Sequence, residues 1–447
     1  MKTHDLIVLG AGNAGLAAAS VAREAGWSVL VVESLDVGGT CPLRGCVPKK
    51  VLVAAAEALD VIRRASAHCI TVSEPKLDWA ALVQRERTFV DGVPAQIAES
   101  LTRRGIELVE GRARFVSEDA VEVEGRRFTA DKILVATGSA PRALAIPGFE
   151  HALSSADLLS REVLPRSIAF IGAGVIGFEL AHVLARAGSR VTLLETAERP
   201  LARHDPDQVA ELVRISEAIG IEVRTGVRVE AIAREAHGAL AVHLAGDAAP
   251  VSVEVVANTA GRAPALSGLG LEAAGIDWDG VGVALTGEFQ SAENARVFFA
   301  GDALPGRPQL SPLATAEGRA AGRRIVRGSD AELDYDSVPS AIYTVPALAS
   351  VGLTEATAAE RGLEIDAKVS DMRSWRSART YAEEAAWAKV LIERSTDRIV
   401  GAHLVGHGAT ETVHAFASAI EHGWTASDVR GRTYAYPTFH ADLKYLV

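Results

Sequence analysis

Two cysteines five positions apart carry the most specific chemistry that this sequence could perform. Cys41 and Cys46 lie in the segment Gly38–Lys50, which reads GGTCPLRGCVPKK. Pro48 suits the first turn of a helix that continues through VLVAAAEALDVIRR, because proline is favoured at helix starts. Cys46 is therefore expected at a helix N-terminus, where the helix dipole and nearby lysines stabilise a thiolate. Cys41 precedes Cys46 in the chain and is expected to be the more accessible of the two thiols.

Three interpretations of this pair are open. A metal site would need two further ligands, and the sequence offers no second cysteine pair and no Cys/His cluster. Two inert core thiols are the plain alternative. A redox-active dithiol or disulfide fits best, because a bridge that closes so small a loop is strained and easily reduced. Cys69 lies in a polar amphipathic stretch and is expected to be an incidental thiol.

Two copies of a glycine-rich motif point to phosphate-binding turns. The apolar run Asp5–Leu9 leads into Gly10-Ala11-Gly12-Asn13-Ala14-Gly15, then into an alanine-rich helical pattern and a strand-like run that ends at Glu33. The same order recurs with SIAFI, Gly172-Ala173-Gly174-Val175-Ile176-Gly177, a helical pattern and a run that ends at Glu195. In each copy the acid lies 18 positions after the third glycine. This order predicts two Rossmann-type units, whereas two ordinary glycine turns would leave both acids unexplained.

The parts of these motifs have separate physical roles. The first glycine makes the tight turn, the second lets a pyrophosphate approach the backbone, and the third lets the helix pack on the strand. The helix N-terminus presents N–H groups and a partial positive charge to the phosphates. The terminal carboxylate accepts hydrogen bonds from a ribose diol. Two such sites imply two dinucleotides, of which a flavin and a nicotinamide are the economical pair.

The remaining elements complete an α/β chain. DKILVATGSAPR is expected to be a strand that enters a turn at Thr137-Gly138-Ser139, and ARVFFAGDAL a strand that ends at Gly301-Asp302. From about Ser337, short alternating strands precede the helical pattern ETVHAFASAIEHG. This change of pattern predicts a separate C-terminal α+β domain.

The composition restricts the classes of function. The 447 residues suggest about three domains, and 48% apolar with 23% charged residues is typical of a soluble globular protein. A formal net charge of −11 without a basic block argues against nucleic acid as the main partner. The first residues lack the features of a signal peptide, no stretch approaches about 20 apolar residues, and membrane association is not expected. Three cysteines suit a reducing cytoplasm.

On these motifs, GGTCPLRGCVPKK above all, the chain resembles the flavoprotein pyridine nucleotide-disulfide oxidoreductases over essentially its whole length. That family includes glutathione reductase, dihydrolipoamide dehydrogenase and mercuric reductase. The resemblance implies two Rossmann-like domains and a C-terminal α+β domain. The implied FAD-binding domain comprises residues 1–147 and a central segment 266–333, the NAD(P)-binding domain residues 148–265, and the interface domain of a homodimer residues 334–447.

The resemblance also implies which residues contact the cofactors. The implied FAD contacts are Gly10, Gly12, Ala14, Gly15, Glu33, Thr40, Ala113, Thr137, Gly138, Gly301, Asp302 and Ala314. The implied contacts of the nicotinamide nucleotide are Gly172, Gly174, Gly177, Glu195 and Gly261. The family's lysine near flavin N5 falls in the pair Lys49–Lys50, and its glutamate partner falls on Glu179. The plain alternative for the lysine and the glutamate is a surface ion pair of little energetic value.

The implied reaction moves a hydride from a reduced nicotinamide to FAD and then electrons to the Cys41–Cys46 disulfide. Cys46 would be the flavin-proximal thiol, and Cys41 would attack the disulfide of the substrate. NADH is favoured over NADPH, because Glu195 would repel a 2′-phosphate, and because Thr196 and Ala202 occupy positions where NADPH-using relatives carry arginines. Arg199 and Arg203 lie close by and could soften this preference.

The C-terminal tail departs from the family pattern. Disulfide-reducing relatives carry His-Pro-Thr followed by Glu, whereas Tyr436 and Ala441 stand at the His and Glu positions here. A phenol does not exchange protons at neutral pH as an imidazole does. His440, oriented by Asp442, is one candidate to replace the family's histidine. The plain alternative is that His440 is only a polar residue in a turn. Mercuric reductase is similar in having a tyrosine at this place, but it also carries a C-terminal cysteine pair that this chain lacks.

The function expected from these features is an FAD-dependent, NADH-preferring oxidoreductase that reduces a small disulfide or a comparable acceptor. One alternative is a quinone, metal or dye reductase that passes electrons directly from FAD. The other is a flavin-binding redox sensor whose dithiol does not turn over rapidly. No residue of the chain identifies the acceptor.

Overall fold

The computed structural model describes residues 2–246, 248–328, 333–406 and 408–447. The chain forms two compact units. The first comprises Met1–Lys49, Arg85–Arg142 and Gly261–Leu333, and the second Lys50–Gln84, Ala143–Ala260 and Asp334–Val447. Both combine helices with sheets, so the α/β fold class predicted from the sequence is confirmed.

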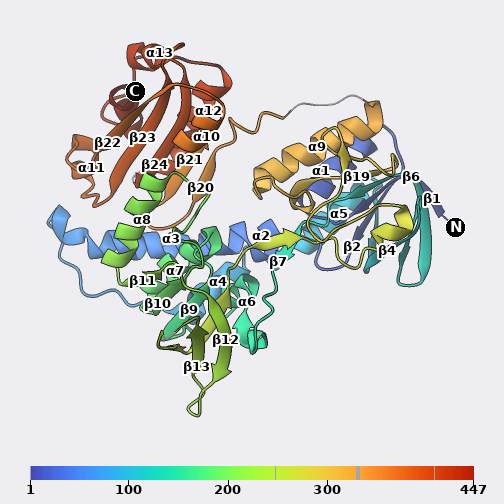
Figure 1. Cartoon of the computed structure of the whole chain (residues 1–447), viewed down its shortest axis with the longest axis horizontal. Helices are drawn as coiled ribbons and strands as arrows, with labels where there is room; N and C mark the ends of the chain where they lie inside the picture. The colour runs from blue at the N-terminus through green and yellow to red at the C-terminus, as the bar shows by residue number, and fades with distance from the viewer. Residues whose placement is uncertain (1, 247, 329–332, 407) are drawn as a thin grey trace. The chain divides into compact units, whose positions relative to one another are not determined.

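A nine-stranded sheet organises the first unit, with its main path in the order β17-β18-β19-β6-β1-β2-β3 (Figure 1). Five of its strands pair in parallel, namely β1 (Lys2–Leu9), β2 (Val29–Glu33), β3 (Glu107–Glu110), β6 (Arg126–Val135) and β19 (Val297–Phe299). The others are β4 (Ala113–Ser117), β5 (Ala120–Val123), β17 (Leu285–Thr286) and β18 (Gln290–Ser291). Leu6, Ile7 and Val8 of β1 are completely buried. An uninterrupted apolar run is expected for a central parallel strand that is covered on both faces.

Helices α1 (Asn13–Glu24) and α9 (Ser311–Arg327) lie side by side in this unit (Figure 1). Their close approach requires glycine on α9, because a Cβ on Gly318 would lie 2.1 Å from the carbonyl oxygen of Ala14. As a result, the first residue of α1 reaches the first residue of α9: the side chain of Asn13 donates hydrogen bonds to Ser311.

The second unit contains a five-stranded sheet in the order β11-β10-β9-β15-β8, with every pair parallel. The strands are β8 (Ala152–Leu153), β9 (Ser167–Ile171), β10 (Arg190–Leu194), β11 (Ile221–Arg224) and β15 (Val255–Asn258). Helix α7 (Val175–Ala187) connects β9 to β10, and α8 (Pro206–Ala218) connects β10 to β11. The β9-α7-β10 segment therefore repeats the β1-α1-β2 segment. An antiparallel sheet of β12 (Val229–Arg234), β13 (Leu240–Leu244) and β14 (Val251–Val253) adjoins it (Figure 1).

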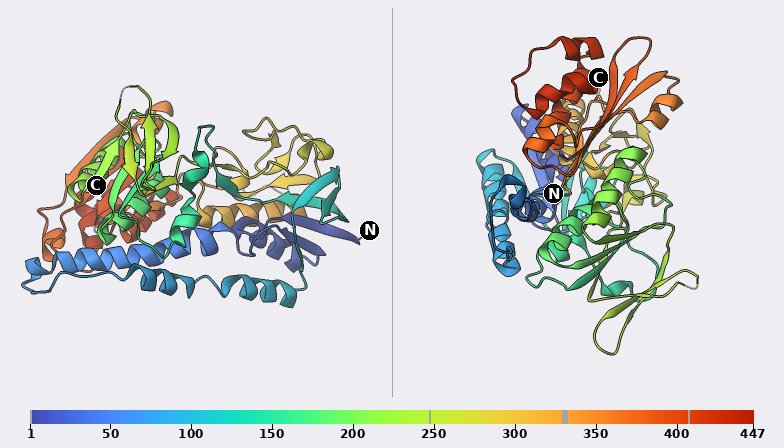
Figure 2. Two further views of the ribbon diagram at one scale, coloured as in Figure 1. Left: turned by 90° about the horizontal axis from the view of Figure 1, so that it is seen from below. Right: turned by 90° about the vertical axis from the view of Figure 1, so that its left-hand side faces the viewer.

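The C-terminal part of the second unit, drawn in orange to red in Figure 2, contains an antiparallel sheet. Its strand order is β20-β21-β24-β23-β22. Its strands are β20 (Ser340–Ile342), β21 (Leu348–Gly352), β22 (Ile365–Asp371), β23 (Ala386–Glu393) and β24 (Ile399–Gly406). Helix α12 (Ala409–Glu421) packs on this sheet, with Val413 and Phe416 in one apolar cluster with Val351 and Leu404. The short strands and the long helix are those that the sequence predicts for this region.

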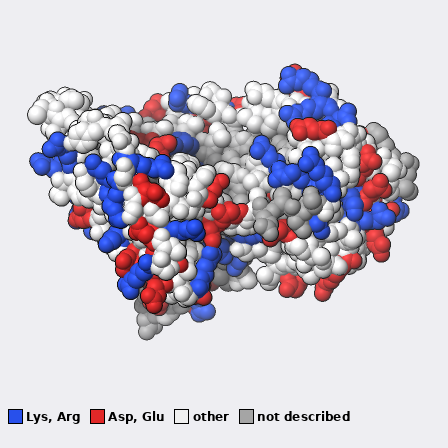
Figure 3. Space-filling view, turned by 90° about the horizontal axis from the view of Figure 1, so that it is seen from above, with Lys and Arg blue, Asp and Glu red and all other residues white. Residues whose placement is uncertain are grey.

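The remaining helices carry the cysteines or lie at the periphery. They are α2 (Thr40–Arg44), α3 (Cys46–Arg63), α4 (Trp79–Arg87), α5 (Val93–Arg103), α6 (Ser155–Leu159), α10 (Glu355–Glu360), α11 (Arg376–Thr380), α13 (Ala426–Gly431) and α14 (Leu443–Leu446). Within the described ranges, no helix combines the length and the apolar character that crossing a membrane requires. On the face drawn in Figure 3, basic and acidic side chains are interspersed.

Candidate functional site

The first glycine motif forms a tight turn between β1 and α1. Gly10 has a φ of +108°, and a Cβ there would lie 2.3 Å from the carbonyl oxygen of Ala136. A Cβ on Gly15 would lie 2.0 Å from the carbonyl oxygen of Gly10. Gly12 is the N-cap of α1 and provides no side-chain cap. A bound anion would therefore be the natural partner for the first N–H groups of this helix.

The second motif has the same geometry between β9 and α7. Gly172 has a φ of +103°, and its Cβ would lie 2.5 Å from the carbonyl oxygen of Thr259. A Cβ on Gly177 would lie 2.6 Å from the carbonyl oxygen of Gly172. Gly174 is the N-cap of α7, again without a side-chain cap. The structure thus contains two glycine turns of matching geometry, one in each unit.

The two acids that follow the motifs occupy matching positions. Oε2 of Glu33 accepts a hydrogen bond of 2.8 Å from the N–H of Ala11. Oε2 of Glu195 accepts one of 2.9 Å from the N–H of Ala173. Each carboxylate is thereby held against the backbone of its own glycine turn. If a pyrophosphate were bound on the turn, the ribose diol next to it would meet the carboxylate at this position.

A half-buried polar cluster lies beside the first motif. The hydroxyl of Ser139 donates to Oδ2 of Asp302 at 3.0 Å, and Nε of Arg262 donates to the hydroxyl of Ser139 at 2.9 Å. Burial raises the pKa of Asp302, and the hydrogen bond from Ser139 and the charge of Arg262 oppose this rise. Arg262 is not among the residues predicted from the sequence, because only the pairing of β7 (Ser139–Pro141) with β16 (Arg262–Pro264) brings it here.

The residues of the first unit fit a dinucleotide such as FAD. The hydroxyl of Thr137 is buried and has no hydrogen-bond partner in the described structure. Gly12 faces Gly39 so closely that a Cβ on Gly39 would lie 2.7 Å from the Cα of Gly12. Gly301 has a φ of +68°, and a Cβ there would lie 2.9 Å from the Cβ of Ala14. Closely packed glycines, an unpaired hydroxyl and a helix N-terminus are features that fit a flavin dinucleotide.

The predicted cofactor contacts are divided between the two units. The first unit contains Gly10, Gly12, Ala14, Gly15, Glu33, Thr40, Lys49, Ala113, Thr137, Gly138, Gly261, Gly301, Asp302 and Ala314, and the second contains Lys50, Gly172, Gly174, Gly177, Glu179 and Glu195. Gly261 therefore lies in the unit of the first glycine motif, although it falls within residues 148–265, the range implied for the NAD(P)-binding domain.

The cysteine pair lies at the junction of two helices in the first unit. Cys41 belongs to the short helix α2, which the sequence does not predict, and Cys46 begins α3 as expected. Both are free thiols in the structure; Cys46 is exposed and Cys41 is half-buried, the reverse of the predicted accessibility. Among the described residues, no cluster of His, Cys, Asp or Glu suited to a metal ion is found.

The electrostatic environment favours a thiolate at Cys41. Its pKa is lowered to about 6, chiefly by a hydrogen bond from the Cys46 side chain, although burial opposes the shift. A hydrogen bond from Ser311 and the charge of Lys49 lower the pKa further. Asn13 holds the Ser311 hydroxyl through a 2.5 Å hydrogen bond. The sequence predicts thiolate stabilisation at Cys46 rather than at Cys41. It does not point to Asn13 and Ser311, which come from the starts of α1 and α9.

The low pKa predicts the pH dependence of alkylation at Cys41. In the reduced protein, the rate with iodoacetamide should be nearly constant above pH 7 and fall about tenfold per pH unit well below pH 6, because only the thiolate reacts. Replacement Cys46→Ala removes the main stabilising hydrogen bond and should move the midpoint upward. Peptide-level mass spectrometry measures the rate at each cysteine. An unshifted midpoint in Cys46→Ala would contradict the assigned cause.

Lys50 and Glu179 both lie against Tyr343 in the second unit. Nζ of Lys50 lies 4.5 Å from the centroid of the Tyr343 ring, and it pairs with Glu57 at 3.2 Å. Glu179 is buried, and its Oε1 accepts a 2.9 Å hydrogen bond from the N–H of Tyr343. The carboxylate of Glu179 is buried on α7. Glu179 is therefore not part of a surface ion pair, which is the plain alternative for these residues.

In the C-terminal tail, Tyr436 contacts an arginine that the sequence does not predict, and His440 is not paired with Asp442 among the described residues. Tyr436 is 67% exposed, and its hydroxyl accepts a 2.9 Å hydrogen bond from Arg376. His440 is exposed, and its ring lies 5.9 Å from the ring of Tyr434. No hydrogen bond joins His440 to Asp442 in the part of the chain that the structure describes. Arg376, on α11, is thus the residue that contacts the tyrosine at the family's histidine position.

Comparisons with known proteins agree with this geometry. The family described as pyridine nucleotide-disulphide oxidoreductase matches residues 4–318, and the dimerisation domain of the same family matches residues 338–447. A mercuric reductase of Bacillus cereus is 31% identical over 99% of this chain and 71% of its own length. A glutathione reductase of Nostoc sp. is 32% identical over 97% of each chain.

A solved structure is similar over the full length. It is the Cu(II) complex of the HOCl-induced flavoprotein disulfide reductase RclA from Escherichia coli, with a TM-score of 0.89 and 25% sequence identity. The similarity covers 100% of this chain and 99% of that chain.

Proposed function

The chain belongs to the pyridine nucleotide-disulphide oxidoreductase family, and from this premise we propose that it oxidises NADH and reduces a small disulfide through the Cys41–Cys46 pair. The family makes it an oxidoreductase that depends on FAD and a pyridine nucleotide. The choice of NADH, the disulfide and the roles of the individual residues are the proposal. The observation that carries it is the stabilised Cys41 thiolate beside Cys46.

The cysteines perform the exchange with the acceptor. The Cys41 thiolate attacks one sulfur of the acceptor disulfide, forms a mixed disulfide and releases the other sulfur as a thiolate, which takes up a proton. The Cys46 thiolate then attacks the Cys41 sulfur and releases the second acceptor thiol, which leaves a Cys41–Cys46 disulfide. Ser311 and Lys49 favour the attacking form of Cys41 before the reaction. FAD, when bound, supplies the two-electron link between the nicotinamide and the cysteine pair.

The two glycine turns are assigned to different nucleotides. We assign FAD to the turn at Gly10–Gly15, because Thr137, Asp302 and the cysteines belong to the same unit. The turn at Gly172–Gly177, in the proposed domain 148–265, binds the nicotinamide nucleotide. The domain that matches residues 338–447 supports a homodimer.

The contacts of the loop after β10 support NADH as the electron donor. Glu195 offers a carboxylate that a 2′-hydroxyl can donate to and that repels a 2′-phosphate. Arg199, a candidate to bind such a phosphate, donates instead to the carbonyl oxygens of Ala202 and His204 at 2.7 and 3.0 Å. Arg199 thus uses two of its N–H donors to hold its own loop rather than to bind a ligand.

A metal ion is a second candidate acceptor. It is favoured by the tyrosine at position 436 and by the similarity to a mercuric reductase, and a reductase of similar structure is known as a Cu(II) complex. A quinone or dye that takes electrons directly from the flavin, and a sensor without rapid turnover, are the remaining alternatives.

A screen of electron donors and acceptors tests the proposal. We expect kcat/KM with NADH to exceed that with NADPH by about tenfold or more. The reason is that a repulsion of about 1.4 kcal/mol between Glu195 and the 2′-phosphate of NADPH already gives this factor. The acceptors are oxidised glutathione, lipoamide, an aromatic disulfide, menadione, Hg²⁺ and Cu²⁺. Turnover with a disulfide supports the proposal. Turnover with a metal ion or a quinone alone contradicts it in favour of those acceptors, and turnover with none of them favours the sensor.

A further inference from the structure

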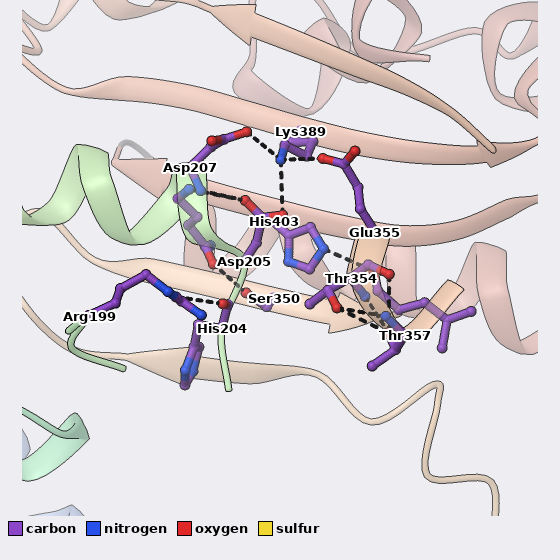
Figure 4. Close-up of polar contacts among 12 residues, drawn as sticks. Arg199, His204, Asp205, Asp207, Ser350, Thr354, Glu355, Thr357, Lys389 and His403 are labelled. Carbon is purple, nitrogen blue, oxygen red and sulfur yellow. Dashed lines mark hydrogen bonds and ion pairs between the residues drawn. The ribbon is translucent and has the colours of Figure 1, made fainter. Parts of the chain in front are cut away.

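A buried lysine in the second unit is surrounded by carboxylates outside both glycine turns (Figure 4). Lys389, in the middle of β23, is 1% exposed. Its Nζ lies 3.0 Å from Oδ2 of Asp205, 2.5 Å from Oδ2 of Asp207 and 2.7 Å from Oε1 of Glu355. Burial alone would lower the pKa of Lys389, but the three hydrogen bonds outweigh burial and raise it, so the side chain is charged. The proposed electron-transfer chemistry uses none of these residues.

Asp205 connects this lysine to the start of α8. Asp205 is completely buried and is the N-cap of the helix. Its Oδ1 accepts hydrogen bonds of 3.1 Å from the N–H groups of Asp207 and Gln208, while its Oδ2 accepts the bond from Lys389. Both carboxylate oxygens are therefore in use, one for the helix and one for β23.

Gln208 attaches the same helical turn to the C-terminal sheet. Its buried side-chain amide donates to the carbonyl oxygens of Ala349 on β21 and Leu404 on β24, at 2.8 and 2.9 Å. The hydroxyl of Ser350 donates to its Oε1 at 2.8 Å. The first turn of α8 is thus fixed to three strands of this sheet by buried polar contacts, which are costly to break.

The loop 195–204 begins at Glu195, the acid that follows the second glycine motif. It ends immediately before Asp205. At one end, Glu195 is bound to the N–H of Ala173 in the glycine turn. Near the other end, the N–H of buried Leu201, whose φ is +48°, donates to the carbonyl oxygen of Ala173 at 3.3 Å. Arg199 closes the loop on itself through Ala202 and His204 (Figure 4). The loop 195–204 therefore lies against the glycine turn, and its C-terminal end is anchored by Asp205.

We propose that Lys389 is a positioning residue for the pyridine nucleotide: through Asp205 it anchors the loop 195–204 against the second glycine turn. This inference rests on the proposed function in one respect, the assignment of that turn to the nicotinamide nucleotide. It adds a residue of the C-terminal domain, 184 positions from its partner, to the determinants of nucleotide binding.

The test removes both charges of the buried pair Lys389–Asp205. The other two carboxylates that lose the lysine, Asp207 and Glu355, are more than half exposed to solvent. In the double variant Lys389→Met with Asp205→Asn, asparagine keeps the N-cap acceptor and methionine has nearly the volume of lysine. A second variant, Arg199→Gln, loosens the loop without touching the buried pair. The matched control is Lys368→Met, which removes a lysine from exposed β22 in the same sheet.

Both loop variants should raise KM for NADH about tenfold, within the range known for residues that act without touching the ligand. They should leave FAD content unchanged and kcat within about twofold. The dissociation constant of ADP-ribose, measured by calorimetry, should rise in parallel. Lys368→Met should change none of these values.

Other outcomes overturn the proposal. An unchanged KM and an unchanged affinity for ADP-ribose in folded, FAD-containing variants would show that the ion pair is only structural, as would a loss of kcat at constant KM. If the double variant does not fold, Arg199→Gln decides by the same two measurements. If the unaltered enzyme oxidises neither NADH nor NADPH, the proposed function fails, and ADP-ribose binding still tests the loop.

Discussion

Replacement Cys41→Ser should abolish disulfide reduction. A serine hydroxyl is a far weaker nucleophile than a thiolate and cannot form the internal disulfide, so turnover should fall at least about a thousandfold, the scale on which nucleophile removal acts. The lowered pKa of Cys41 makes it the sulfur that is anionic at neutral pH and hence the attacking one. The measurement is the rate of NADH oxidation with the best disulfide found in the acceptor screen.

The same variant separates the disulfide route from direct flavin chemistry. Ferricyanide reduction should stay within about twofold of the unaltered enzyme, because a one-electron dye does not need the cysteine pair. Cys69→Ser, which changes an exposed thiol on another segment, is the matched control and should keep both activities. Disulfide turnover that survives Cys41→Ser would show that the acceptor takes electrons elsewhere.

The positions of the nucleotide sites could be predicted because their determinants are local in sequence. Glu33 and Glu195 each bind the glycine turn of their own βαβ unit, about twenty residues away. The start of α3 at Cys46 was likewise predictable, because proline in a first turn is a local signal. Strand, turn and helix patterns of this kind depend on neighbouring residues alone.

The partners of the reactive residues could not be predicted, because they depend on tertiary packing. Ser311 reaches Cys41 only because Gly318 lets α9 approach α1. Arg376 meets Tyr436 across 60 positions, whereas the sequence pairs His440 with Asp442, which lies two positions away in the chain. The sequence predicts Cys41 as the more accessible thiol, whereas it is half-buried; it belongs to the short helix α2, which has no strong local signal.

The two glycine N-caps allow one experiment to assign both nucleotides. In Gly12→Ala, the nearest described atom to the new methyl group is the Cα of Gly39 at 3.8 Å, and in Gly174→Ala it is the carbonyl oxygen of Thr259 at 4.0 Å. Both glycines have φ near −87°, which alanine adopts freely. The protein should therefore tolerate both methyl groups, whereas a pyrophosphate that lies on the turn should not.

We expect Gly12→Ala to weaken FAD binding and Gly174→Ala to weaken binding of the nicotinamide nucleotide. An intruding methyl group costs about 1–3 kcal/mol, which corresponds to a roughly 5- to 150-fold rise in the dissociation constant. Gly12→Ala should lose its flavin absorbance on dialysis and all activities with it. Gly174→Ala should keep its flavin and show a raised KM for NADH. Each variant serves as the control for the other, because the substitution is the same and only the turn differs. If Gly12→Ala kept its flavin and Gly174→Ala lost it, the assignment of FAD to the first turn would be reversed.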